Sequence, residues 1–451
     1  MKKVLNAAAC AMLVVSMSAN SYAADLVKRG SAGDDVREVQ EMLISMGYLD
    51  PGEDDGKFGP KTEKAVLAFQ EDHSLDATGI VGEGTLNVMK TGGADQEPDA
   101  AEAEETTEET ADESIDPTEA FPSWNPDSET LKELVEFVAD CTDESGAGYL
   151  DPADRIAVFD MDGTILCEKA PVYFDYCLTM YRVLDDPTYN ATEEEKNAMQ
   201  QTRDHAYANG EVFDPEIGPG KNDLVASAFA GMTPEEFRSY VVDFADHVDA
   251  VGFEGMTYGE SFYKPMIEVI DYLRANDFDV WMVSACEREV VRALVERYDI
   301  PFDHVVATDV PYDASGKGEE PADKYNMSQE DILLLGAPIA DVECGKSGKP
   351  AGIAREIGKR PVLAFGNSSG DFSMLNYAEG NPNHEGMGFF VVCDDTEREY
   401  GSDEKAAEYY EVVENENWTA ISMANDWAVI YGDGVQKTEL PGAEEALYDA
   451  A

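Results

Sequence analysis

Two aspartates directly after an apolar run are the residues of this sequence whose types and spacing most clearly point to chemistry. The run Ile156 to Phe159 is short, rich in β-formers and flanked by charged residues, which predicts a buried strand. It ends in Asp160 and Asp162, followed by Gly163 and Thr164. Two carboxylates so close together repel each other unless a cation lies between them. The spacing therefore predicts a metal and phosphate site, with an ordinary Asp-Gly turn as the alternative.

A hydroxyl residue follows a second apolar run. Ser284 comes directly after the run Val280 to Val283, and a helix is expected from about Glu287. A hydroxyl beside the free amides of a helix start can bind a phosphate oxygen. Ser284 is therefore a candidate phosphate ligand, and a simple helix cap is the alternative.

A lysine in a glycine-rich stretch is the candidate for neutralising a phosphoryl group. Lys349 lies within residues 345–353, which lead into a helix before the apolar run Val362 to Phe365. An ammonium group at such a position offsets the charge of a bound phosphate. Lys346 and Lys359 compete for this role, and a solvated surface position is the alternative for all three.

A last set of oxygen ligands follows the run Val362 to Phe365. The stretch Gly366-Asn-Ser-Ser-Gly-Asp places Asn367 and Asp371 there. The carboxyl ends of parallel strands meet at one edge of a sheet. We therefore expect these two side chains to lie close to Asp160. Unrelated turns and caps seldom produce these residue types in this order.

Together, these stretches resemble the motifs of haloacid dehalogenase-type phosphohydrolases, across roughly residues 121–434. The resemblance implies that Asp160 is the nucleophile, which attacks phosphorus and forms an aspartyl-phosphate. Asp162 would protonate the leaving oxygen and then activate water. Because dehalogenating members lack this second aspartate, phosphate ester chemistry is favoured. The residues implied to hold the transferring phosphoryl group are Gly163, Thr164, Ser284 and Lys349.

The same resemblance implies a magnesium ion. Its ligands would be Asp160, the main-chain carbonyl of Asp162, Asn367 and Asp371. Many relatives have aspartate where this chain has Asn367, and a neutral amide either weakens metal affinity or shifts the work to Asp371. Two hypotheses follow: an exported Mg²⁺-dependent phosphomonoesterase tethered to the cell wall, or a catalytically weak or inactive peptidoglycan-binding scaffold.

Several stretches resemble the secreted branch of the superfamily that includes phosphorylcholine phosphatases, which makes that ester a candidate substrate. Four aromatic residues after Asp162 offer a cage for a quaternary ammonium group, or else belong to a buried core: Tyr173, Phe174, Tyr176 and Tyr181. The stretches that carry the resemblance are residues 121–124 (FPSW), 263–266 (YKPM), 366–371 (GNSSGD), 398–400 (REY) and 424–427 (ANDW).

The elements that position these residues alternate between strands and helices. The runs 156–159, 280–283, 305–307 and 362–365 predict strands, and Thr192 and Thr233 begin helices between the first two. This alternation predicts an α/β fold with a doubly wound, Rossmann-like parallel sheet. The long gap between Asp160 and Ser284 predicts a helical cap at about 170–256 that closes over small substrates. We expect this hydrolase domain to span 121–437, before an acidic tail at 438–451.

Residues 25–90 predict a small three-helix domain. Val36, Val39, Leu43 and Met46 recur at helical spacing, and Thr62 is expected to cap a second helix. The pattern resembles the peptidoglycan-binding module of cell-wall hydrolases. That resemblance implies a wall polymer as partner, with a purely structural role as the alternative.

The segments on either side of this domain differ from it in composition. Residues 1–23 resemble a signal peptide, with Lys2 and Lys3 before an apolar run and a small-residue cleavage site at 21–23. Residues 91–120 are acidic and almost without apolar side chains, which predicts a disordered linker. We therefore expect a secreted protein that is associated with the cell wall.

Composition restricts the partners further. The 451-residue chain carries a net charge of −62, which disfavours nucleic acid and anionic lipid as partners. No segment after the signal is long enough to span a membrane. Of seven cysteines, Cys10 would leave with the signal. The other six allow disulfides or buried free thiols.

Overall fold

The computed structural model describes residues 33–46, 48–49, 56–73, 81, 83–91, 120–211, 221–321, 323–336 and 343–442. The chain divides into two compact units, residues 1–111 and 112–451. The expected signal peptide, nearly all of the linker and most of the acidic tail lie outside the described residues. Within these residues, no helix is long and apolar enough to cross a membrane.

The described part of the first unit contains three helices, α1 (Asp34–Met46), α2 (Pro60–Asp72) and α3 (Glu83–Thr91). Leu43 and Phe69 lie fully buried in their shared core, as the helical spacing predicts. Gln40 on α1 donates a hydrogen bond to Thr62, at 3.1 Å, and Gln70 on α2 donates to Thr85, also at 3.1 Å. The prediction that Thr62 caps the second helix is therefore wrong. It lies inside α2 and accepts a buried bond from α1.

The second unit is built on a six-stranded parallel sheet with the order β4-β3-β1-β7-β8-β9. The chain builds outward from β1 to one edge, and then returns to build from β7 to the other edge. This order confirms the doubly wound prediction, and it places the topological switch point between β1 and β7. The strands are β1 (Ile156–Phe159), β3 (Asp279–Glu287), β4 (Val305–Thr308), β7 (Leu363–Gly366), β8 (Met387–Val392) and β9 (Thr419–Ser422).

Helices cover both faces of this sheet, because successive side chains of a strand point to opposite faces. On β1, Ala157 and Phe159 belong to one hydrophobic core, and Ile156 and Val158 belong to the other. The first core includes α5 (Glu129–Thr142), α10 (Lys264–Ala275) and α11 (Arg288–Val295). The second core includes α12 (Gly348–Glu356), α13 (Phe372–Glu379) and α14 (Asp403–Glu416).

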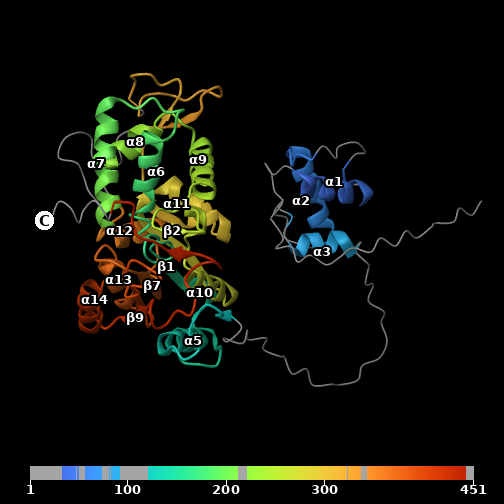
Figure 1. Ribbon diagram of the computed structural model, residues 1–451. Helices are drawn as coiled ribbons and strands as arrows, with labels where there is room; N and C mark the ends of the chain where they lie inside the picture. The colour runs from blue at the N-terminus through green and yellow to red at the C-terminus, as the bar shows by residue number, and fades with distance from the viewer. Residues whose placement is uncertain are drawn as a thin grey trace, which may run out of the picture. The chain divides into compact units, whose positions relative to one another are not determined.

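Between β1 and β3, four of the described helices stand apart from the sheet (Figure 1). They are α6 (Phe174–Leu184), α7 (Glu193–Asn209), α8 (Lys221–Phe229) and α9 (Pro234–His247). Thr192 and Thr233 begin α7 and α9, as predicted, each through a reciprocal capping box with a glutamate three residues later. The short strands pair as β2 (Phe253–Glu254) with β10 (Gln436–Lys437), and as β5 (Tyr312–Ala314) with β6 (Leu333–Leu335).

Candidate active site

The predicted site residues lie on neighbouring strands at the carboxyl edge of the sheet. Asp160 follows β1, which is paired with β3 on one side and with β7 on the other. Ser284 lies near the end of β3, and Asp371 lies in the loop after β7. Because β1 is central, its first aspartate lies between the other two strand ends, as the sequence predicts for a parallel sheet.

Lys349 joins the two aspartates that come from different strands. Its ammonium group lies 2.5 Å from Asp160 Oδ1 and 2.6 Å from Asp371 Oδ1, and it also donates to the carbonyl of Val283 at 2.8 Å. The lysine is 2% exposed. Burial lowers the pKa of Lys349, but the charges of Asp160 and Asp371 outweigh that effect and raise it above its ordinary value. The lysine is therefore charged, and it holds the two strand ends together.

Asp160 is buried, and only one of its oxygens is taken up by the lysine. Burial and the nearby charge of Asp371 raise the pKa of Asp160 to about 7, and Lys349 opposes the increase. The main-chain amide of Met161 also bonds to this carboxylate and lowers its pKa, and the side chain lines a cavity. The lysine thus fixes one oxygen of Asp160, and the carboxylate still borders the space where a reacting group would bind.

Asp371 is fully engaged by its own surroundings. Its Oδ1 pairs with Lys349, and its Oδ2 accepts bonds from the main-chain amides of Asn367 and Ser368, at 3.1 and 3.0 Å. The hydroxyl of Ser368 donates to the same oxygen at 3.2 Å. These contacts fold the loop after β7 around the carboxylate. Asp371 therefore acts as the anchor of that loop and of the lysine.

Asn367 does not line the cavity; it lies behind the cavity wall, 8% exposed. Its amide Nδ2 donates to Glu168 Oε2 at 3.0 Å, and its Oδ1 lies 3.4 Å from the hydroxyl of Thr164. Because a carboxylate only accepts hydrogen bonds, the contact with Glu168 fixes which way the amide points. A Cβ at Gly163, where φ is +80°, would lie 1.9 Å from the Asn367 nitrogen. The glycine therefore allows this approach.

The loop residues predicted to bind phosphate differ in their surroundings. Gly163 and Thr164 are buried and do not line the cavity, whereas Asp162 does. A carboxylate oxygen of Asp162 accepts a bond from the main-chain amide of Phe174, at 3.3 Å, in the first turn of α6. The second aspartate is thereby linked to the first helix of the segment between β1 and β3.

Ser284 lies within β3, which is longer than predicted, and it is not a helix cap. Glu287 caps α11, which begins at Arg288. Ser284 instead accepts a bond from the amide of Cys286 at 3.1 Å, and it lines the cavity with 1% of its surface exposed. The register of β3 and β4 shifts between Ser284 and Glu287, so the strand is irregular where it passes the cavity.

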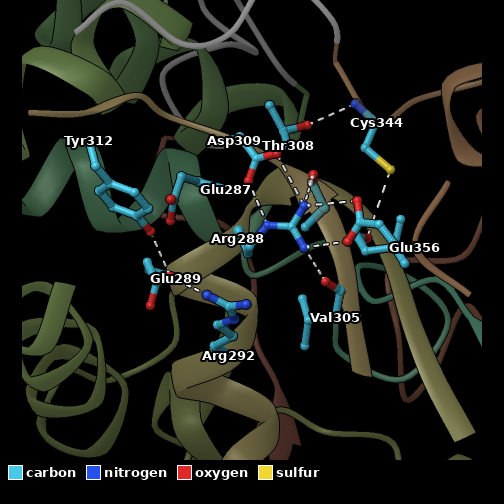
Figure 2. A network of polar contacts seen from close by, with 12 residues as sticks. Glu287, Arg288, Glu289, Arg292, Val305, Thr308, Asp309, Tyr312, Cys344 and Glu356 are labelled. Atoms are coloured by element: carbon cyan, nitrogen blue, oxygen red, sulfur yellow. Dashed lines mark hydrogen bonds and ion pairs between the residues drawn. The ribbon is translucent and has the colours of Figure 1, made fainter. Parts of the chain in front are cut away.

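A buried arginine fixes the junction of β3 and α11 (Figure 2). The guanidinium of Arg288 pairs with Asp309 at 2.5 Å and with Glu356 at 2.9 Å, and it donates to the carbonyl of Val305. These partners come from the two ends of β4 and from α12. The arginine therefore connects three elements directly behind the strand end that carries Ser284.

Thr308 makes a second connection between these loops (Figure 2). Its hydroxyl donates to the carbonyl of Ala285 at 2.8 Å and accepts a bond from the amide of Cys344 at 2.9 Å. Lys346 adds a further contact, because its amide donates to the carbonyl of Gly370 at 2.9 Å. The loops that carry Ser284, Lys349 and Asp371 are thus joined through their main chains.

The side chains of the two competing lysines lie elsewhere. Lys359 is bound at the surface to Asp154, at 2.7 Å, and does not line the cavity. Lys346 is exposed and lines the cavity, without any ion pair to the described part of the chain. Only Lys349 has the buried position between two carboxylates that the phosphoryl-binding role requires.

These residues form the floor of a cavity of about 1010 Å³. Tyr173 and Tyr176 line it, whereas Phe174 and Tyr181 pack into an aromatic core around Phe244, so half of the predicted cage is core. Sequence reasoning did not find Glu168, Lys405 or Tyr409, which also line the cavity. Glu168 is eight residues beyond Asp160, and no pattern singles it out. Lys405 and Tyr409 lie on a helix after β8, a strand that was not predicted.

Oxygen donors around the floor suit a hard divalent cation. No group of three or more His, Cys, Asp and Glu side chains in the described ranges is arranged to hold a metal. Magnesium, however, commonly takes one or two carboxylates, and fills its other positions with water and substrate oxygens. Asp160 and Glu168 both present carboxylates to this cavity. Its lining has seven acidic side chains against four lysines, so a phosphate dianion needs an additional cation to bind.

Four of the five stretches that resemble phosphorylcholine phosphatases pack together away from the cavity. Trp124 pairs with Trp427 in an isolated bridge and donates to the carbonyl of Pro265 at 2.9 Å. Tyr263 packs on Trp427, with ring centroids 5.2 Å apart, and Arg398 donates to the Trp427 carbonyl at 3.0 Å. These stretches are therefore part of the structural support of the domain, and none of their residues lines the cavity.

The described cysteines form no disulfide. Five of the six are buried, and Cys393 is half-buried: Cys141, Cys167, Cys177, Cys286, Cys344 and Cys393. Burial raises the pKa of Cys177 to about 12, and the same cause raises the pKa of Cys141 to about 12. Of the two alternatives left by the sequence, the described part of the chain has buried free thiols.

Comparison with protein families gives two matches. Residues 32–89 match the family described as "Putative peptidoglycan binding domain", and residues 157–376 match the haloacid dehalogenase-like hydrolases. A curated relative is the carboxy-terminal processing protease CtpB of Bacillus subtilis, 36% identical over 56 residues. The matched region is 12% of this chain and 12% of that protease.

Solved structures resemble the second unit at low identity. A functionally unknown protein from Anaerococcus prevotii is 15% identical with a TM-score of 0.42, covering 66% of this chain and 92% of the other. A haloacid dehalogenase family hydrolase from Salmonella enterica is 14% identical with a TM-score of 0.31, covering 60% and 67%. Because these identities and TM-scores are low, the assignment of the two domains to families rests on the two family models.

Proposed function

Because the chain carries a haloacid dehalogenase-like hydrolase domain after a peptidoglycan-binding domain, we propose that it is a phosphomonoesterase that acts on small phosphate esters at the cell wall. One observation carries this proposal. The buried ammonium group of Lys349 lies between Asp160 and Asp371 at the floor of a large cavity, so an oriented carboxylate borders the space where an ester would bind.

The reaction divides between the two aspartates of the first loop. Asp160 Oδ2 attacks phosphorus, the ester oxygen departs, and an aspartyl-phosphate forms. Asp162 gives its proton to the departing oxygen, and then takes a proton from the water that hydrolyses the intermediate. The bond from the Phe174 amide holds Asp162 at the mouth of the helical segment. Ser284 donates to a phosphoryl oxygen, and Lys349 offsets negative charge on the transferring group.

A magnesium ion fits the oxygen donors at this floor. Asp160, the main-chain carbonyl of Asp162 and a nearby side-chain oxygen would hold it. Bound there, it would offset phosphoryl charge and align the ester with the nucleophile.

The cavity wall favours a substrate with a small cationic end, such as phosphorylcholine. Tyr173, Tyr176 and Tyr409 offer aromatic faces, and Asp175 and Glu211 offer negative charge. These residues come from the start of α6, from the stretch just after α7 and from α14. Phosphorylcholine is therefore the first ester to test.

The activity test uses the full chain. We expect Mg²⁺-dependent phosphate release from an aryl phosphate, and loss of that release in Asp160→Asn. Asp154→Asn is the matched control, because Asp154 lies outside the cavity. Activity that survives in Asp160→Asn would exclude it as the nucleophile. A panel of phosphorylcholine, phosphoethanolamine, phosphoserine and sugar phosphates would then rank substrates.

The wall-binding and export proposals rest on the first unit and on the signal-like start of the sequence. Full-length protein should sediment with insoluble peptidoglycan. Phe69 is fully buried in the first core, so Phe69→Ala should unfold that small unit and abolish sedimentation while phosphate release continues. Sedimentation that is unchanged in this variant would contradict wall binding through the first unit.

A further inference from the structure

Glu168 occupies a position in the cavity that the mechanism above leaves unused. It lies just after the loop of the two reactive aspartates and lines the same cavity. Asp160 and Asp371 both pair with Lys349, whereas Glu168 forms no ion pair with any described residue. Its partners are neutral groups, the amide of Asn367 at 3.0 Å and the hydroxyl of Tyr173.

The surroundings of Glu168 are arranged to hold its carboxylate in one place. Asn367 lies behind it, oriented by Thr164, and can present only its N–H₂ group to a carboxylate. Gly163 makes room for this pair, since an added Cβ would lie 1.9 Å from Asn367 Nδ2 and 3.0 Å from Glu168 Oε2. The Glu168 carboxylate is held in a fixed orientation and has no cationic partner among the described residues, so it is suited to binding a cation.

The other carboxylate that the sequence offers for this purpose is already occupied. Both oxygens of Asp371 are engaged, one by the ammonium group of Lys349 and the other by two amides and a hydroxyl. Recruiting Asp371 to a metal would break the contacts that hold the loop after β7. Asn367 lies behind the cavity wall, so it acts on the cavity only through Glu168, the side chain that it orients.

We propose that Glu168 is a ligand of the divalent cation, and that Asn367 is a positioning residue that holds Glu168 toward the cation. The proposal rests on the phosphomonoesterase function proposed above. It explains how a chain with asparagine at position 367 can retain a metal site. The negative ligand is supplied from the loop after β1 and not from the loop after β7.

The test measures metal binding without substrate. All four tryptophans, Trp124, Trp281, Trp418 and Trp427, lie in the second unit, so their fluorescence reports the unfolding of that unit alone. A cation that binds only the folded state raises the urea midpoint as its concentration increases, which gives an apparent Kd. In Glu168→Gln, which can still accept from Asn367, we expect Mg²⁺ affinity to fall by about tenfold or more.

Two further variants separate ligation from general charge and from misfolding. Glu343 is an exposed acid on the lining of the same cavity, so Glu343→Gln should leave Mg²⁺ affinity within about twofold. Glu168→Asp keeps the charge on a shorter side chain and should recover part of the affinity. A Glu168→Gln midpoint without Mg²⁺ close to that of the wild type shows that the fold is intact.

Other results would overturn the proposal in distinguishable ways. If Glu168→Gln binds Mg²⁺ like the wild type and only raises KM for phosphorylcholine, then Glu168 contacts substrate and is not a ligand, while the phosphomonoesterase function stands. Equal losses in Glu168→Gln and Glu343→Gln would show a general charge effect and would also exclude ligation. If the wild type releases no phosphate from any ester with Mg²⁺, the proposed function fails and the ligand assignment fails with it.

Discussion

Replacing Lys349 by methionine is the most direct test of how this site is held together. Methionine is similar in length and apolar, so the variant fills the same space without the ammonium group. Two buried carboxylates, at 2.5 and 2.6 Å from the lost nitrogen, are then left facing each other without a cation. Removing one partner of a buried ion pair typically destabilises a protein by about 3–5 kcal/mol. We expect the second unit to lose a free energy of unfolding of this size at pH 8.

The expected loss depends on pH in a definite direction. In the wild type, burial and Asp371 raise the pKa of Asp160 to about 7, and Lys349 opposes that increase. Without the lysine, the folded-state pKa of Asp160 is higher still, so the variant gains stability as the pH falls and the carboxyl takes up a proton. The difference between wild type and Lys349→Met should therefore become smaller from pH 8 to pH 6.

Urea unfolding followed by tryptophan fluorescence measures both quantities for the second unit. Lys359→Met is the matched control, because its ion pair with Asp154 lies at the surface and is worth less than about 1 kcal/mol. The Lys349→Met protein should also release no phosphate. The reasoning fails if Lys349→Met is as stable as Lys359→Met at pH 8, or if its deficit increases as the pH falls.

Two further perturbations test the surroundings of the site. Gly163→Ala places a side chain on a backbone with positive φ, which costs about 1–2 kcal/mol, and its Cβ also displaces Asn367. The variant should therefore be less stable and lose activity. Gly358 also has positive φ, but an added Cβ would meet open space, so Gly358→Ala should lose stability and keep its activity. Equal activities in the two variants would contradict the contact between residue 163 and Asn367. The second perturbation concerns Glu287, which is 2% exposed and has one oxygen without a hydrogen bond; burial raises its pKa to about 8. Because the unfolded chain releases this proton near pH 4.5, stability should fall by a few kcal/mol between pH 4.5 and 8, at about 1.36 kcal/mol per pKa unit. Glu287→Gln should reduce the dependence of the unfolding free energy on pH, measured by urea unfolding at several pH values. An unchanged pH dependence in this variant would show that Glu287 is not its cause.

Local sequence patterns were sufficient for the strands that carry the chemistry. The runs that become β1, β3, β4 and β7 are short and apolar, because strands buried on both faces have no polar alternation. The capping boxes at Thr192 and Thr233 depend only on residues three positions apart, so they too could be predicted. Edge strand β9, with only four residues and partial burial, has a weaker signal and was not predicted.

The amino-acid sequence by itself determined the order of the reactive groups and the doubly wound sheet, because residue type, apolar runs and helix starts are local properties. Only the tertiary structure decided which charges meet. It chose Lys349 over Lys346 and Lys359, paired Asp371 with that lysine, and placed Asn367 behind Glu168. These outcomes depend on contacts between residues more than twenty positions apart, and on the space left by a glycine, which no local pattern records.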